Sequence, residues 1–136
     1  MKLNLQKVQG KFGMQAFNEE GQYINFDGGE AIGGAGFGVR PMEAVAASLA
    51  ACASIDVLLI LDKQRIELSN YEIAIDAVRE EGVPGVFSKI HLTYKLEGSD
   101  QLQKIERAVE LSMTKYCSVS KILEPTCQVT YSVELN

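Results

Sequence analysis

The stretch from Met42 to Arg65 constrains the fold more than any other part of this sequence. It is rich in alanine and leucine, which favour helix, and the preceding Pro41 suits the first turn of one. Apolar residues fall on nearly every face of the predicted helix: Val45, Ala46, Leu49, Ala53, Ile55, Leu58, Leu59 and Leu61. A helix that is apolar all round is normally buried on all sides. In so small a protein, such a helix needs either a sheet wrapped around it or a second subunit.

Short segments with alternating apolar and polar residues surround this helix and predict strands. The six predicted strands are Lys2–Val8, Lys11–Phe17, Gln22–Phe26, Tyr71–Arg79, Val86–Leu96 and Gln128–Leu135. Asp100, with Gln103 three residues later, predicts the N-cap and capping box of a second helix. Ser118 is the predicted cap of a short third helix that ends at Leu123, before Pro125. The order βββ-α-ββ-α-α-β predicts an α+β fold with largely antiparallel sheets rather than a doubly wound parallel sheet.

A glycine-rich segment precedes the central helix. Six of the eleven residues from 28 to 38 are glycine, which is too many for a regular element, so we expect a mobile loop. The segment lacks the Lys-Ser/Thr pair of a phosphate-binding P-loop and the spacing of a dinucleotide fingerprint. A flexible entry to the helix is the better interpretation.

Length and charge narrow the class of protein. The 136 residues suit one domain, residues 1–136, and the net charge of −5 argues against a nucleic-acid partner. The first residues alternate polar and apolar, unlike a signal peptide, and the longest apolar run, Val57–Leu61, is too short to span a bilayer. We therefore expect a cytoplasmic protein without a membrane partner, whose thiols stay reduced.

Three cysteines are the residues most able to carry chemistry. Cys52 lies mid-helix, and Ser48 and Asp56 fall within about 40° of it, one turn before and one turn after. A thiol between a hydroxyl and a carboxylate is unusual for packing alone. Glu43 falls on the opposite side of a straight helix. By these residues alone, Cys52 fits the core better than a catalytic role.

The other cysteines differ in their surroundings. Cys117 stands just before the predicted Ser118 cap, where free N–H groups and the helix dipole favour a thiolate. Packing at an elbow between two helices explains Cys117 equally well. Cys127 has no activating neighbour and is predicted to be structural. Three scattered cysteines and a single histidine show no metal-ligand spacing, so we expect neither a metal nor a cofactor.

Two segments together resemble one protein family. Residues 40–57 read RPMEAVAASLAACASIDV, and far downstream AVELS at 108–112 is followed by KYCSV at 115–119. This pairing resembles the OsmC/Ohr family, osmotically inducible protein C and organic hydroperoxide resistance proteins, and in detail its OsmC-like branch. The resemblance implies an intertwined homodimer in which a buried central helix packs under wrapped sheets.

The resemblance also implies a reaction. The residue matching Cys52 attacks an organic hydroperoxide and becomes a sulfenic acid, and the one matching Cys117 resolves it as a disulfide. A lipoyl-type dithiol or a small thiol would regenerate the pair. This sequence departs from the family at two places, because no arginine precedes Arg40 and Met42 occupies the position of the family's glutamate. Arg40 and Glu43 are therefore the possible supporting residues, together with Ser48 and Asp56.

Three hypotheses follow for the function. The leading one is a thiol-dependent peroxidase that reduces organic hydroperoxides in oxidative stress defence. The alternative is a non-catalytic OsmC-like dimer that has lost the activating Arg and Glu and binds a small apolar ligand. A third is another thiol reaction that uses Cys52 without a resolving step.

Overall fold

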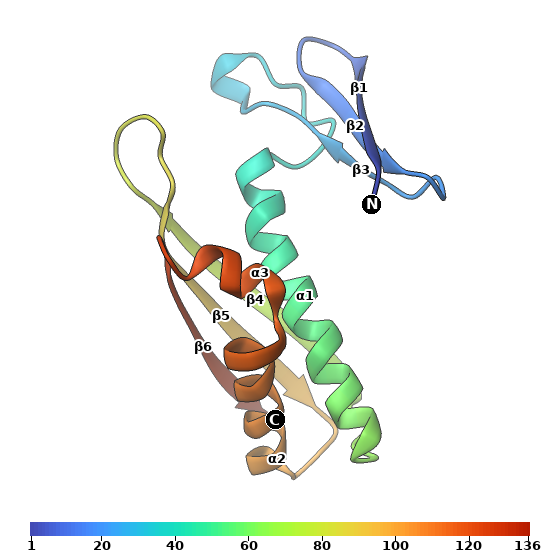
Figure 1. The fold of residues 1–136 in the computed structure, drawn as a ribbon, viewed down its shortest axis with the longest axis vertical. Coiled ribbons are helices and arrows are strands. Elements are labelled where there is room, and N and C mark those ends of the chain that lie inside the picture. Colours follow the sequence, from blue (N-terminus) through green and yellow to red (C-terminus); the bar gives the residue numbers. More distant parts are fainter. The chain divides into compact units, whose positions relative to one another are not determined.

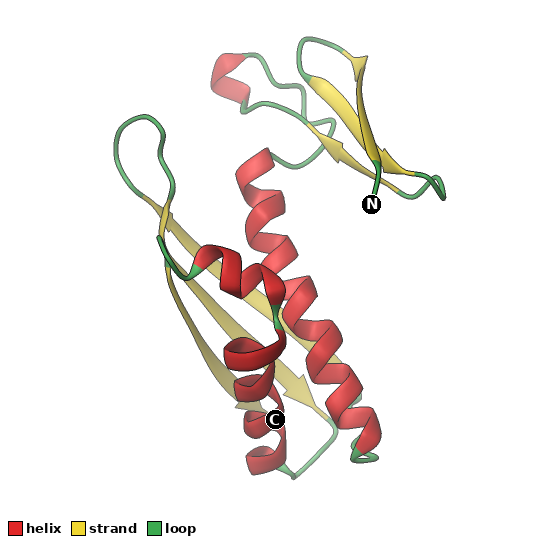
Figure 2. Cartoon of the chain, viewed as in Figure 1, coloured by secondary structure: helices red, strands yellow, loops and turns green.

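The computed structural model describes all residues from 1 to 136 and contains two three-stranded sheets and several helices (Figures 1 and 2). Contacts divide the chain into two compact units, Met1–Val45 and Ala46–Asn136, which are described separately. The strands are β1 (Leu3–Gln9), β2 (Gly13–Asn18), β3 (Tyr23–Phe26), β4 (Asn70–Arg79), β5 (Phe87–Glu97) and β6 (Gln128–Leu135). The helical segments are η1 (Glu30–Ile32), α1 (Pro41–Lys63), α2 (Leu102–Leu111), η2 (Ser112–Tyr116) and α3 (Ser118–Leu123). The predicted α+β class and element order are confirmed.

The first unit begins with the predicted β-meander. β2 pairs antiparallel with both β1 and β3. The β2–β3 turn is held by Asn18, whose Oδ1 accepts hydrogen bonds of 3.0 Å from the amides of Glu20 and Gln22. Gly21 completes this turn with a φ of 83°, a left-handed conformation that favours glycine.

A buried carboxylate organises the glycine-rich loop that follows β3. Asp27 is only 2% exposed. Its Oδ1 accepts from the Gly28 amide at 2.7 Å, and its Oδ2 accepts from the amides of Ala35 and Phe37, each at 3.0 Å. The loop also approaches itself closely, since a Cβ on Gly34 would lie 1.9 Å from the Gly28 carbonyl oxygen. The loop was predicted from its glycines, but the sequence analysis missed the aspartate that anchors it and the short helical turn η1 within it.

The Asp27 anchor predicts an acid-dependent loss of stability. Hydrogen bonds from the Phe37, Ala35 and Gly28 amides hold the pKa of Asp27 below its ordinary value of 3.8 against the opposing effect of burial. A carboxyl whose pKa is lowered by folding contributes stability above its unfolded pKa and loses it as the pH falls through its folded pKa. We therefore expect Asp27→Asn to lower the unfolding temperature at pH 6, and to narrow the difference from wild type below about pH 4. Thermal unfolding followed by circular dichroism from pH 7 to 2 tests this, and a difference that does not shrink in acid would contradict it.

The second unit contains a mixed sheet in the order β4-β5-β6. β4 pairs antiparallel with β5, from Asn70↔Glu97 to Arg79↔Phe87, whereas β6 pairs parallel with β5. The sequence analysis predicted largely antiparallel sheets, and three of the four strand pairs are antiparallel; the parallel β5–β6 pair is the exception. Its cause is the connection: α2, η2 and α3 form a helical crossover that returns the chain to the starting end of β5, and a crossover of this kind gives a parallel pair.

The core of the second unit lies between this sheet and the helices on one of its faces (Figure 1). The fully buried residues of β5, α1 and α2 are Ile90, Leu92, Tyr94, Leu96, Leu49, Ala53, Val57, Ile105, Ala108 and Val109. They recur at every second position on β5 and at intervals of three or four on the helices, as packed faces require. The predicted α2 cap is wrong, because α2 begins at Leu102 and Gln101 occupies its cap position. Ser99, not Asp100, accepts the Gln101 amide, at 3.2 Å.

The opposite face of α1 is apolar but exposed within a single chain. Ile55, Leu58 and Leu59 are 62%, 46% and 56% exposed, respectively. By length and composition, α1 could cross a membrane, because its mean hydropathy over its most apolar stretch is 2.3. The sequence analysis expected no membrane-spanning segment, because it considered only the longest unbroken run of apolar residues. A helix buried along one side, as α1 is, equally suits the core of a globular fold. The sequence analysis predicted that α1 is buried on all sides, but within a single chain only one side of α1 is buried.

Candidate active site

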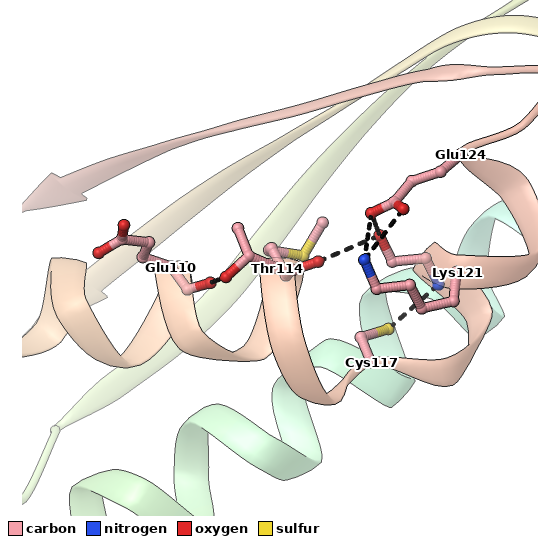
Figure 3. Close-up of polar contacts among 7 residues, drawn as sticks. Glu110, Thr114, Cys117, Lys121 and Glu124 are labelled. Atoms are coloured by element: carbon pink, nitrogen blue, oxygen red, sulfur yellow. Dashed lines mark hydrogen bonds and ion pairs between the residues drawn. The ribbon is translucent and has the colours of Figure 1, made fainter.

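Cys117 lies at the junction between η2 and α3 (Figure 3). It is the N-cap of α3, with an extended backbone at φ −67° and ψ 108°, and its Sγ accepts a hydrogen bond of 3.4 Å from the Ser120 amide. The sequence analysis assigned this cap to Ser118, which instead forms the exposed first residue of the helix. A thiol can replace the usual hydroxyl because the cap needs only an acceptor that faces the third amide of the helix.

Cys117 is fully buried and held against α1. Its Sγ lies 4.0 Å from the Leu49 carbonyl oxygen, and its own amide donates to the Ser112 carbonyl at 2.8 Å. Ser112 in turn donates its hydroxyl to the Ala53 carbonyl at 3.0 Å. Two successive turns of α1 are thus joined to the segment that carries Cys117, and Cys52 lies between the two contacted residues in sequence.

The two predicted cysteines are brought together by these contacts. Burial raises the pKa of the Cys117 thiol to about 11, and the amides of Ser120 and Val119 oppose this rise. The neighbouring Cys52 side chain raises the pKa of Cys117 further, through a hydrogen bond and a charge interaction, so the two side chains lie close to one another. Cys52 is half-buried, whereas Cys117 has no exposed surface. A half-accessible sulfur beside a buried one can be oxidised first and then form a disulfide.

Ser48 and Asp56 flank Cys52 on α1, as the helical spacing predicted. Ser48 is exposed, and Asp56 is half-buried. Because Asp56 is only half-buried, its carboxylate retains access to water and does not need a buried charge partner.

Arg40 and Glu43 belong to the N-terminal unit and bind one another. The Arg40 Nη2 and Nε atoms lie 2.6 Å and 3.1 Å from Glu43 Oε1, and the Arg40 amide donates to Oε2 at 2.9 Å. The last bond is one half of a capping box at the start of α1. The side-chain bond from Arg40 holds the pKa of Glu43 below its ordinary value. Both residues also line a cavity of about 580 Å³ beside the glycine-rich loop.

Sequence reasoning missed three residues close to Cys117. The Tyr94 hydroxyl donates to the Met113 sulfur at 3.8 Å, and burial followed by charge interactions with Tyr71 and Cys117 raises the pKa of Tyr94. Ser120 is 1% exposed, and its amide donates the hydrogen bond that Cys117 Sγ accepts as the helix cap. The spacing of three residues from Cys117 to Ser120 matches that from an N-cap to its amide donor and could have identified Ser120. Nothing in the sequence pattern placed Tyr94 or Met113 beside a cysteine far away in the chain.

Comparison with known proteins identifies the family. The family model described as OsmC-like protein matches residues 33–132. The chain belongs to the OsmC-like family. Among curated relatives, Protein YhfA of Escherichia coli K12 is 38% identical over 96 residues, which cover 70% of this chain and 72% of YhfA.

Solved structures of the OsmC-like fold agree with this assignment. A hypothetical protein from Aquifex aeolicus VF5 has a TM-score of 0.80 and 26% identity, over 99% of this chain and 96% of its own. A Legionella pneumophila protein named as organic hydroperoxide resistance protein OsmC has a TM-score of 0.70 and 19% identity, over 98% and 97% of the two chains. The predicted family and fold class are therefore confirmed.

Proposed function

We propose that this OsmC-like protein is a thiol-dependent peroxidase that reduces organic hydroperoxides through Cys52 and Cys117. The observation that carries the proposal is that the segment of the buried Cys117 is held against α1 at Leu49 and Ala53, which lie on either side of the half-buried Cys52 in the sequence. The effect of Cys52 on the pKa of Cys117 supports the same proximity. The hydroperoxide-resistance name of a structural neighbour supports the choice of substrate.

The proposed reaction has two chemical steps. The Cys52 thiolate attacks the terminal oxygen of the hydroperoxide, the O–O bond breaks, and the alkoxide takes a proton and leaves as an alcohol. Cys52 then carries a sulfenic acid. The Cys117 sulfur attacks the Cys52 sulfur, the S–O bond breaks, and water leaves as the disulfide forms. A dithiol reductant, lipoyl-type or small, exchanges with this disulfide, and its own oxidation restores both thiols.

The assembly and its location are also proposals. The exposed apolar residues of α1 support a homodimer, because contiguous apolar surface of this kind usually marks an interface. A cytoplasmic location suits a protein whose cysteines are free thiols. Arg40 and Glu43 are proposed as supporting residues on the strength of the family resemblance alone.

The proposal is tested by a single turnover. We treat the reduced protein with one equivalent of cumene hydroperoxide and count free thiols by alkylation and intact mass. The wild type is expected to lose two of its three free thiols and two mass units, and Cys117→Ser is expected to stop at a sulfenic acid on Cys52. A wild type that keeps all three thiols would contradict the proposal.

A small-ligand-binding module is the second candidate function. The cavity of about 580 Å³ beside the glycine-rich loop, which Arg40 and Glu43 line, favours it. In that case the protein would survive peroxide treatment with its thiols unchanged. A sulfenic acid in the wild type without a disulfide would instead indicate a thiol reaction without a resolving step.

A further inference from the structure

Ser120 makes two side-chain contacts in addition to the amide bond that completes the cap of α3. Besides its amide bond to Cys117 Sγ at 3.4 Å, its hydroxyl lies 3.3 Å from the Met113 carbonyl oxygen and 3.4 Å from Glu124 Oε1. Glu124 is itself held by Lys121, whose Nζ lies 3.1 Å from Oε2 (Figure 3). Ser120 thus joins the π-helical segment before Cys117 to the helix after it.

The contacts of Ser120 lie next to an irregular part of the backbone, the π-helical turn η2 and the Cys117 that follows it. η2 is a π-helical turn, a form that is rare and less well bonded than an α-helix, and it ends at the extended Cys117. Beyond the Cys117 amide bond to Ser112, the side chain of Ser120 is the buried link that returns from α3 to η2. Without the hydroxyl bond to Met113, the Ser120 amide would be held less firmly in the direction of Cys117 Sγ.

We propose that Ser120 is a positioning residue for the resolving step, which holds the Cys117 sulfur where it can attack an oxidised Cys52. This inference rests on the proposed peroxidase function. The hydroxyl bond to Met113 fixes the first turn of α3, and that turn presents the Ser120 amide to Cys117 Sγ. The sulfur then keeps one orientation, between the α1 backbone at Leu49 and its own helix.

The amide has a chemical effect as well as a geometric one. A backbone N–H that donates to a sulfur stabilises the thiolate over the thiol. The groups that face Cys117 from the neighbouring elements are Cys52 on α1 and Tyr94 on β5, and neither is a cation. The amides of Ser120 and Val119 lower the pKa of Cys117 against the larger effect of burial, and so favour the attacking thiolate.

Two rates separate the two steps of the reaction. The first, formation of the Cys52 sulfenic acid, is followed by trapping with dimedone after rapid mixing with cumene hydroperoxide. The second, the disappearance of the trappable sulfenic acid, reports attack by Cys117. For Ser120→Ala we expect the first rate to be unchanged and the second to fall about fivefold to tenfold, the equivalent of about one lost hydrogen bond. We also expect the pH profile of the second rate to shift to higher pH.

Three control variants sharpen the test. Ser120→Thr keeps a hydroxyl and is expected to recover most of the second rate. Ser118→Ala removes an exposed hydroxyl from the same turn and should leave both rates unchanged. Glu124→Gln keeps an acceptor for Ser120 while removing its charge, and it too should leave the second rate within twofold if the bond to Met113 is the important one. Thermal unfolding of each variant shows whether the fold is intact.

The possible failures can be told apart. If Ser120→Ala resolves its sulfenic acid at the wild-type rate, or if Ser118→Ala slows resolution equally, the positioning role is wrong while the peroxidase function stands. If the wild type never forms a sulfenic acid or a disulfide, the proposed function fails and this inference fails with it.

Discussion

Replacing Cys52 with serine is expected to abolish turnover of organic hydroperoxides, with a loss on the order of a thousandfold or more in the rate of cumene hydroperoxide consumption. The sulfur is the atom that is oxidised, and a serine hydroxyl neither ionises near neutral pH nor accepts a peroxide oxygen. Because Cys52 is half-buried and serine is slightly smaller, the fold should survive. Peroxide consumption is measured with excess dithiothreitol, which also serves as the reductant.

Cys127→Ser is the matched control for this loss. Cys127 is 5% exposed, and burial raises its pKa, with no thiol or cation among the causes. It makes a weak contact of 3.8 Å with the Gln128 carbonyl oxygen. We therefore expect Cys127→Ser to retain activity within about twofold of wild type, apart from a modest cost in stability of about 1 kcal/mol for a buried polar change. Equal losses from the two substitutions would contradict a specific role for Cys52.

The second large effect concerns assembly. Ile55 is 62% exposed on α1 within one chain. If a second copy covers this face, Ile55→Lys buries an unpaired ammonium there, which costs several kcal/mol and is enough to dissociate a dimer. We expect the wild type to elute at twice the mass of one chain and Ile55→Lys to elute as a monomer or to unfold. Size-exclusion chromatography with light scattering measures both.

Ile122→Lys provides the comparison for Ile55. Ile122 lies on α3 and is 74% exposed, so the same substitution is made at a site of similar exposure in the single chain. We expect Ile122→Lys to remain dimeric. A wild-type protein that is monomeric at micromolar concentration, or an Ile55→Lys variant that stays dimeric, would contradict the proposed interface.

Local patterns predicted the elements well because their causes are local. α1 was expected from its composition, and the structure has it from Pro41 to Lys63. The alternation of apolar and polar residues predicted β5, and its apolar residues Ile90, Leu92 and Tyr94, at every second position, are all fully buried. Helix propensity and the alternation of apolar and polar residues in a strand depend only on residues that are close in the sequence, so a single sequence is enough to show them.

The features that sequence reasoning missed depend on how distant segments meet. The capping box at Asp100 is plausible by spacing, but the loop takes a different course and Ser99 accepts the Gln101 amide instead. The parallel β5–β6 pair follows from the path of the whole crossover. Asp27 reaches amides eight and ten residues ahead only because the glycine loop folds back on it.

The candidate site shows the same division. Helical spacing placed Ser48 and Asp56 beside Cys52, but spacing alone left Cys52 as a core residue. Cys52 and Cys117 are far apart in the sequence, so only the fold can bring them together. For that reason the sequence implied their pairing only through the family resemblance. The cap of α3 by a thiol was missed because cysteine is an unusual N-cap.

The central claim is that Cys52 and Cys117 become bonded when the protein reduces a hydroperoxide. The direct measurement is a non-reducing peptide map of wild-type protein after one equivalent of cumene hydroperoxide, with free thiols blocked before digestion. We expect a single cross-linked species that joins the Cys52 and Cys117 peptides, while Cys127 appears in its blocked form. A disulfide that includes Cys127, or three blocked thiols with no cross-link, would contradict the account.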